Sequence, residues 1–246
     1  MGASAWKTSL SIYAFLPTIS GSTTFPTLPG NPSPGVNIDA NTIIDHLKMT
    51  FMGTLDIHNG KWGAFTDILY MDIGGNKPKS RDFTIDGVPS TLTGDLSLDI
   101  KGTIWTTAVE YRLATSDPAF TVDALAGVRM FNMKNTLGWN FTGSAGSPLA
   151  GRSGSTVVDE SNWDAIVGVK GNYTFGAERQ WFVPFYFDIG TGQSDLTYQI
   201  LGGIGYRYKW GDVVAAWRYI DYNMKSGKPL ESMNFNGPMI GATWRW

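Results

Sequence analysis

The sequence predicts an all-β fold: a single transmembrane, antiparallel, up-and-down β-barrel over the whole chain, residues 1–246. Ten segments alternate apolar and polar residues with a period of two, the pattern of half-buried strands. Charged residues make up only 16% of the chain, against roughly 25% in soluble domains. The last segment, Gly241–Trp246, puts two tryptophans on one face, which lipid would cover in a membrane barrel.

Each expected strand is identified by apolar residues at alternate positions, which we take to face lipid. In chain order, the strands and representative outward residues are 6–16 (Leu10, Ile12, Ala14), 47–57 (Met49, Phe51, Leu55), 62–72 (Ala64, Ile68, Tyr70), 93–113 (Leu98, Ile100, Val109, Tyr111), 122–130 (Ala124, Ala126, Val128), 163–173 (Ala165, Val167, Val169), 181–189 (Val183, Phe185, Phe187), 196–208 (Tyr198, Ile200, Ile204), 213–219 (Ala215, Trp217) and 240–246 (Ala242, Trp244).

Turn residues support this division. Asn59-Gly60 is a strong hairpin signal between the second and third strands. Within 93–113 the alternation slips by one residue near Gly102, where a β-bulge would restore the register. Barrels of eight or twelve strands are the alternatives, if a hairpin within 73–100 has been split or missed.

Aromatic residues on the outward faces gather near the strand ends. Amphipathic rings prefer the two membrane–water interfaces, so these residues are expected to form interfacial belts. They are Trp6, Trp62, Tyr70, Trp105, Trp163, Tyr173, Trp181, Tyr208, Trp217, Trp244 and Trp246.

The last strand also carries a family resemblance. Gly241, Trp244 and Trp246 stand in a spacing that resembles the C-terminal β-signal of Gram-negative outer-membrane proteins, although Phe is the usual last residue there. The resemblance implies a bacterial outer-membrane location, contact with the lipid bilayer and lipopolysaccharide, and insertion by the barrel-assembly machinery.

The connections alternate in length, as in outer-membrane barrels with short periplasmic turns and longer external loops. External loops are expected near 20–42, 73–92, 134–161 and 223–233, and the link at 190–195 is the one short exception. An even strand count would place both termini on the periplasmic side.

Composition excludes several classes. The net charge of −2 argues against a nucleic-acid partner, and no apolar run is long enough for a transmembrane helix. With no cysteine and two histidines, we expect no metal and no cofactor. A monomer is favoured.

Charges on the inward faces are nearly balanced, with eight cations against seven anions. The residues expected to line the lumen are Lys48, Asp56, Asp67, Asp99, Lys101, Glu110, Arg112, Asp123, Arg129, Asp164, Lys170, Asp188, Arg207, Arg218 and Arg245. Opposite charges in a narrow lumen can pair with each other or line a water-filled path.

Three functions follow from this pattern. The first is a narrow channel for ions or small polar solutes. The second is a closed structural or surface-binding barrel, such as an adhesin or receptor, that acts through its external loops. The third is a hydrolase using His46, which neighbours Asp45, although adjacent residues of a strand point to opposite faces. We expect that the protein is not an enzyme.

Overall fold

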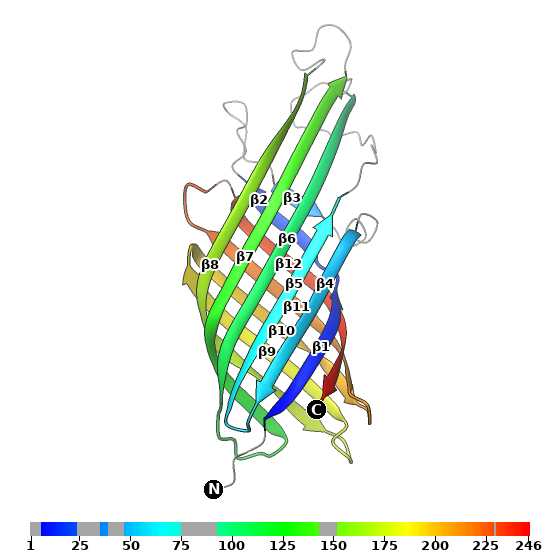
Figure 1. Ribbon diagram of the computed structural model, residues 1–246, viewed down its shortest axis with the longest axis vertical. Helices are drawn as coiled ribbons and strands as arrows, with labels where there is room; N and C mark the ends of the chain where they lie inside the picture. The colour runs from blue at the N-terminus through cyan, green and yellow to red at the C-terminus, as the bar shows by residue number, and fades with distance from the viewer. Residues whose placement is uncertain (1–5, 24–34, 39–46, 75–92, 143–151, 229) are drawn as a thin grey trace.

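The computed structural model describes residues 6–23, 35–38, 47–74, 93–142, 152–228 and 230–246 (Figure 1). These residues form β1 (Lys7–Phe15), β2 (Thr18–Thr23), β3 (Gly35–Ile38), β4 (Leu47–His58), β5 (Trp62–Ile73), β6 (Thr93–Arg112), β7 (Phe120–Thr142), β8 (Arg152–Phe175), β9 (Trp181–Gly192), β10 (Ser194–Arg207), β11 (Asp212–Met224) and β12 (Leu230–Arg245). None of the described residues belongs to a helix long and apolar enough to cross a membrane.

The strands close into the ten-stranded antiparallel barrel that the sequence predicts. Strands β4 to β12 pair in chain order, and β1 closes the ring between β12 and β4. Strand β2 continues the line of β1, because β12 pairs first with β1 at Phe15 and then with β2 at Thr18. The break falls at Pro17, which has no N–H to donate. We therefore count β1 and β2 as one barrel strand, and β3 as a short addition beside β2.

The outer surface is apolar between two groups of aromatic residues. At the end of the barrel where both termini lie, called the lower end from its place in Figure 1, a chain of ring contacts runs from Phe175 through Trp181 and Tyr206 to Trp210. Nearer the other, upper end, Trp105 and Trp163 pack with ring centroids 5.9 Å apart. The eleven aromatics expected in belts all lie on this outer surface, and their depth in a bilayer stays a prediction.

The spacing of the two groups matches a bilayer. On β8, Trp163 and Tyr173 are ten residues apart and both face outward. At about 3.3 Å per residue and a tilt of about 40°, that separation corresponds to about 25 Å of height, the usual thickness of the apolar band.

Strand β6 differs from the sequence prediction. Its pairing with β5 and β7 is continuous from Ile100 to Tyr111, so the bulge expected near Gly102 is absent from this described stretch. Ile100 and Ile104 are both buried inside the barrel. The prediction was wrong because it took every apolar residue to face lipid, whereas the upper lumen is itself apolar.

The loop expected at 134–161 is largely strand. Strands β7 and β8 stay paired up to Phe141 and Arg152, and β6 follows β7 up to Thr142 (Figure 1). Hydropathy alternation does not mark this part because its sequence is mainly Gly, Ser, Thr and Asn. The expected loops at 20–42 and 223–233 also contain strand: β2 and β3 in the first, and the ends of β11 and β12 in the second. Most of the expected loop at 73–92 lies outside the described residues.

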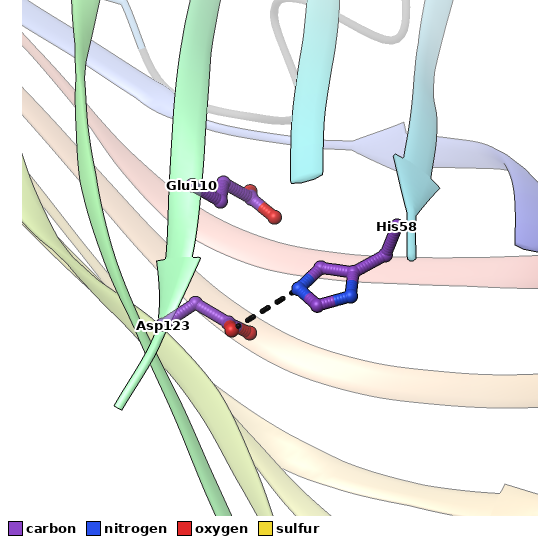
Figure 2. Close-up of side chains that lie close together, drawn as sticks. All are labelled: His58, Glu110 and Asp123. Atoms are coloured by element: carbon purple, nitrogen blue, oxygen red, sulfur yellow. Dashed lines mark ion pairs between the residues drawn. The ribbon is translucent and has the colours of Figure 1, made fainter. Parts of the chain in front are cut away.

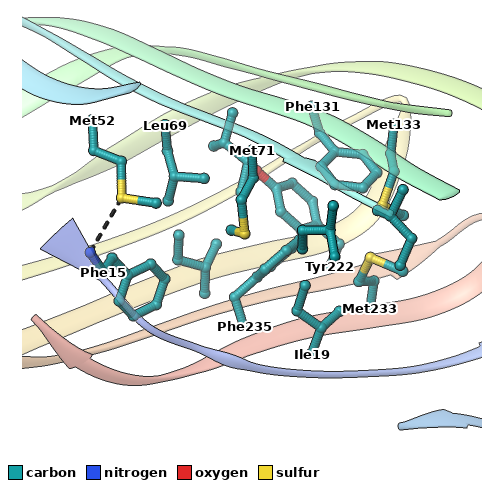
Figure 3. Close-up of a cluster of buried hydrophobic side chains, with 14 of the residues drawn as sticks. Phe15, Ile19, Met52, Leu69, Met71, Phe131, Met133, Tyr222, Met233 and Phe235 are labelled. Atoms are coloured by element: carbon teal, nitrogen blue, oxygen red, sulfur yellow. Dashed lines mark hydrogen bonds between the residues drawn. The ribbon is translucent and has the colours of Figure 1, made fainter. Parts of the chain in front are cut away.

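The upper lumen holds the main hydrophobic core, which we call the apolar plug (Figure 3). Phe131 packs against Tyr222 with centroids 4.5 Å apart and against Phe235 at 6.4 Å. The plug consists of Tyr13, Phe15, Ile19, Met52, Leu69, Met71, Ile73, Ile100, Ile104, Phe131, Met133, Ile220, Tyr222, Met224, Leu230, Met233 and Phe235. Methionine suits such a site because its flexible side chain fills irregular gaps.

Candidate functional site

The lumen is the candidate site because it gathers most of the charged residues expected there. Alternation and burial place these side chains inside: Asp56, Asp67, Glu110, Arg112, Asp123, Arg129, Asp164, Lys170, Asp188, Arg207, Arg218 and Arg245. The side chain of Lys48 lies outside the described part of the structure.

Two expected lumen residues face the other way. Lys101 is 58% exposed and pairs with Asp72 at 3.0 Å on the outer surface of β5 and β6. Asp99 has the same parity on β6 and shares that outer face. Both predictions were wrong for the same reason as the one for Ile100. The side chains of β6 alternate between lumen and lipid without interruption, so the apolar Ile100 faces inward and its charged neighbours face outward.

Arg129 on β7 is the centre of one buried cluster. Its Nη2 forms an ion pair with Asp188 on β9, and neither side chain is exposed. Its Nε and Nη1 donate to the hydroxyls of Thr106 at 3.2 Å and Thr197 at 3.3 Å. Because burying an unpaired charge is costly, these contacts are what make the guanidinium tolerable inside the barrel.

Arg218 on β11 is the centre of a second cluster across the lumen. It donates from Nη2 to Asp67 on β5 at 2.8 Å and from Nη1 to the Tyr13 hydroxyl on β1 at 2.8 Å. Tyr13 in turn donates to Asp67 at 2.8 Å. Gln199 joins the two clusters, because its Oε1 accepts from Arg218 at 3.0 Å and from Arg129 at 3.4 Å. We call this joined set the ion-pair layer; it shares Tyr13 with the apolar plug.

The ion-pair layer lies directly beneath the apolar plug. On β7 the inward residues Phe131 and Met133 follow Arg129, and on β11 Ile220 and Tyr222 follow Arg218. Both strands rise from the lower end (Figure 1), so the plug stacks on the layer. The middle of the lumen is therefore filled by two successive sections of buried side chains.

The lower lumen opens to solvent. Side-chain exposure falls from 51% at Arg245 to 22% at Lys170, 3% at Arg218 and 0% at Arg129. A basin of about 420 Å³ lies here. Within it Lys170 pairs with Asp56 and Glu110, and Arg245 pairs with Asp212. The charges in this basin are thus matched locally.

Three potential metal ligands meet at the basin wall (Figure 2). His58, Glu110 and Asp123 offer ligand atoms within 4.8 Å of one another. However, His58 Nδ1 accepts the Gly60 N–H at 2.7 Å, so the neutral ring carries its proton on Nε2, which faces Asp123 at 3.4 Å. That nitrogen then has no free lone pair for a metal.

The carboxylates of this cluster are also engaged. Arg112 donates to both oxygens of Asp123, at 2.6 and 3.0 Å, and Lys170 pairs with Glu110. A guanidinium that donates two hydrogen bonds to one carboxylate makes a strong, charge-assisted contact. The geometry favours an ion-pair cluster over a metal centre, and the expectation of no metal stays a prediction.

Other expectations fall elsewhere. His46, the candidate hydrolase residue, lies outside the described residues. The proposed assembly signal forms the closing seam, where Gly241 pairs with Tyr13 and Trp244 with Leu10. The sequence analysis did not include Tyr13, Gln199 and Asp212 among the lumen-lining residues. Tyr13 and Gln199 sit at inward positions of the alternation, which is the signal that indicates them, whereas Asp212 precedes the strand predicted over 213–219.

Comparisons with known proteins identify the fold. No protein-family model and no curated protein sequence matches the chain. Among solved structures, the outer membrane protease OmpT from Escherichia coli matches with a TM-score of 0.53 and 10% identity, over 99% of this chain and 97% of that one.

Two further structures were matched with lower TM-scores. Ail of Yersinia pestis gives 0.32 at 12% identity, over 98% of both chains. The translocator domain of the autotransporter NalP from Neisseria meningitidis gives 0.40 at 11% identity, over 100% of this chain and 90% of that one. Similarity this distant concerns the fold alone. The chain has the fold of a Gram-negative outer-membrane β-barrel, as its C-terminal resemblance implies.

Proposed function

We propose that this protein is a closed, non-conducting barrel of the bacterial outer membrane that acts through the upper extension of β6, β7 and β8. The observation that carries the proposal is the filled middle of the lumen. An ion would have to cross the ion-pair layer, where Arg129 and Asp188 are fully buried, and then the apolar plug, where Ile220 and Tyr222 are 0% exposed. Apolar constrictions exclude ions by dewetting. This arrangement favours the closed barrel over the narrow channel.

The extension supports a role at the cell surface. β7 and β8 have 23 and 24 residues, about twice the 9–11 that a tilted strand needs to span a bilayer. From Met130, beside Trp163 of the upper aromatic group, β7 continues eleven residues to Phe141. At about 3.3 Å per residue and a tilt of about 40°, this stretch rises roughly 30 Å. Paired strands of that length present a firm surface for binding.

The proposed orientation places the lower end in the periplasm. Its turns are short, such as Asn59-Gly60 between β4 and β5, and both termini lie there (Figure 1). The extension then faces the lipopolysaccharide and the outside. We also propose that the assembly machinery inserts the barrel by recognising the strand that carries Gly241, Trp244 and Trp246. The protein is further proposed to be a monomer without catalytic activity.

Planar-bilayer recording tests the closed lumen. We expect no conductance steps from the refolded protein, with heat-modifiable gel mobility showing that the barrel has folded. A variant with Phe131→Ala, Tyr222→Ala, Arg129→Ala and Asp188→Ala removes side chains from both filled sections and should conduct. Steady, salt-proportional steps from the unaltered protein would overturn the proposal and restore the channel.

A shortened hairpin tests the surface role. Lys134 and Asp159 are paired, so replacing 135–158 by Asn-Gly would close β7 and β8 with a two-residue turn. Cells that display the full protein should bind at least one member of a panel of immobilised glycans and extracellular-matrix proteins, and cells with the shortened variant at equal surface density should not. Equal binding by both would remove the extension from the proposal.

A further inference from the structure

The strand pairing of the barrel wall is incomplete between β1 and β4. These strands pair from Lys7 opposite His58 up to Ile12 opposite Gly53, and among the described residues their pairing does not continue above that point. The upper part of β4, residues 47–52, pairs with β5 alone, while β1 and then β2 follow β12. Strand β3 pairs with β2 and, within the described part of the chain, not with β4. We call this interval, between residues 13–18 and residues 47–52, the lateral break.

Two buried side chains close the lateral break in this structure. The backbone N–H of Phe15 donates to Met52 Sδ at 3.2 Å, where an unbroken antiparallel ladder would offer a carbonyl oxygen of β4 (Figure 3). A thioether sulfur is a weak acceptor. Both residues are buried, so the wall is sealed. Opening it requires rotation of these side chains, and no ladder hydrogen bond between described residues of β1 and β4 has to break.

The lateral break lies within the apolar band of the outer surface. On the β4 side, Met49 and Phe51 are exposed on the outer face. On the other side, Ile12 of β1 and Ile240 of β12 are exposed in the same way. Such outward apolar residues mark the lipid-facing zone of a membrane barrel. The molecules in contact with the outside of the lateral break are therefore the acyl chains of the membrane.

The apolar plug lies directly behind the lateral break, and its composition allows it to change shape. Phe15 and Met52 are themselves plug residues. A cavity of about 10 Å³ beside Ile19, Leu69 and Met71 shows that the plug is not completely filled. An entering chain must also displace side chains, and flexible methionines make an apolar site adaptable. The plug holds five of the nine methionines of the chain: Met52, Met71, Met133, Met224 and Met233.

We propose that the lateral break is a side-chain gate through which one acyl chain of a membrane lipid enters the apolar plug. Phe15 and Met52 swing aside, the chain packs among the plug methionines, and the polar headgroup stays at the membrane surface. The path ends at the ion-pair layer, so the barrel remains closed to ions while the chain is bound. This site is independent of the surface role proposed above, because it uses the barrel wall within the membrane.

The test is photo-crosslinking of the refolded protein in vesicles of a phospholipid that carries a diazirine in its acyl chain, with mass spectrometry to locate the adducts. We expect adducts on Phe15 and Met52 but none on Leu125 and Ile166. The latter two are also buried and apolar, but they lie behind continuous pairing of β6 to β9. Labelling of neither set would show that the wall stays sealed and would overturn the gate. Equal labelling of both sets would show that lipid does not enter at the lateral break.

The source of the acyl chain is tested in a second arm, with vesicles of unlabelled phospholipid and free palmitate that carries the diazirine. We expect adducts on Phe15 and Met52 in the phospholipid arm. Adducts in the palmitate arm alone would overturn the membrane lipid as the source.

A covalent link across the lateral break tests the path. The chain has no cysteine, so two introduced cysteines form one defined bond. Extending the β1–β4 register past Ile12 and Gly53 places residue 14 opposite residue 51, so Ala14→Cys with Phe51→Cys links the two sides. Oxidation should abolish the labelling of Met52, and reduction should restore it. If the two cysteines stand too far apart to oxidise, a bifunctional maleimide links them instead.

The matched control is Leu10→Cys with Leu55→Cys, at a residue pair of the same two strands below the lateral break. Its oxidation should leave the labelling of Met52 unchanged. Labelling of Met52 that persists in the protein linked at residues 14 and 51 would overturn the gate.

Discussion

Gly241 lies in the seam between β1 and β12 that closes the barrel, opposite a residue of the ion-pair layer. It pairs with Tyr13 across β12 and β1, and a Cβ placed on it would lie 2.8 Å from Tyr13 Cβ and 3.2 Å from the Ile12 carbonyl oxygen. A side chain at position 241 would therefore crowd Tyr13, whose hydroxyl bonds to Asp67 and Arg218. This contact gives the residue a packing role besides its place in the proposed assembly signal.

Gly241→Ala should destabilise the folded barrel by about 1–3 kcal/mol, the usual range for overpacking a filled site. Gly202→Ala is the matched control, because a Cβ there would have no atom within 4 Å. Its effect should stay within about 0.5 kcal/mol. The measurement is equilibrium unfolding in urea with lipid vesicles. Equal effects of the two substitutions would show that Tyr13 moves aside without loss.

The Arg129–Asp188 pair should behave as a buried ion pair. Removing one partner, as in Arg129→Met, should cost about 3–5 kcal/mol, because it leaves the Asp188 charge uncompensated. The double variant Arg129→Met with Asp188→Leu should recover much of that loss. A double-mutant cycle of unfolding free energies checks this result.

The Lys101–Asp72 pair is the control for that cycle. Lys101 is 58% exposed on the outer surface, so solvent screens the pair and the coupling there should be much weaker than at Arg129 and Asp188. A coupling at Arg129 and Asp188 no larger than this would contradict their burial.

For single residues, the sequence predicts whether a side chain faces the lumen or the lipid, but not which residue it pairs with. Alternation alone shows that Arg129, Asp188, Arg218 and Asp67 face inward. Their pairing, Arg129 with Asp188 and Arg218 with Asp67, depends on how strands far apart in the chain are staggered around the barrel, which no local pattern records. Lys101 shows the converse limit, since its direction was inferred from apolar neighbours that face the plug instead of lipid.

Among the elements, β7 and β8 divide into a membrane part and an upper extension. Below Met130 and Trp163 the outward residues are apolar, as lipid requires. Above them the two strands stay paired, but their outward residues need not be apolar. The strands there are held by backbone hydrogen bonds and show no apolar alternation. For this reason the sequence predicts the parts of β7 and β8 within the bilayer, but not where the upper ends of these strands lie.

Replacing 135–158 by Asn-Gly should leave the barrel folded. The removed pairs of β7 with β8, from Asn135 with Val158 upward, lie above the ion-pair layer and include no plug residue, and of the plug residues on β6 only Ile100 loses its β7 partner, Asn135. We expect the same heat-modifiable mobility and an unfolding free energy within about 1 kcal/mol of the full chain. Loss of folding would show that the extension is part of the barrel's cooperative unit.

For the whole molecule, the two aromatic groups predict how deep the barrel sits. Single-tryptophan variants that keep Trp62 or Trp163 should be quenched most by lipids brominated near the headgroup. A variant whose one tryptophan is introduced by Val167→Trp, between the groups, should be quenched most by lipids brominated near the chain ends. Similar depth profiles for all three would contradict a bilayer-spanning orientation.

The position of Tyr13 has a consequence for how the molecule comes apart. Its hydroxyl joins the first strand to Arg218 on β11 and Asp67 on β5, and the ring lies beside the seam between β1 and β12. If β1 separates from β12, Arg218 and Asp67 lose the Tyr13 hydroxyl that both contact. Because Gln199 accepts hydrogen bonds from both Arg218 and Arg129, this loss also weakens the cluster around Arg129. A half-unzipped barrel is then raised in free energy relative to both the closed and the fully unfolded chain, so unfolding should be all-or-none, without a stable open-sided intermediate.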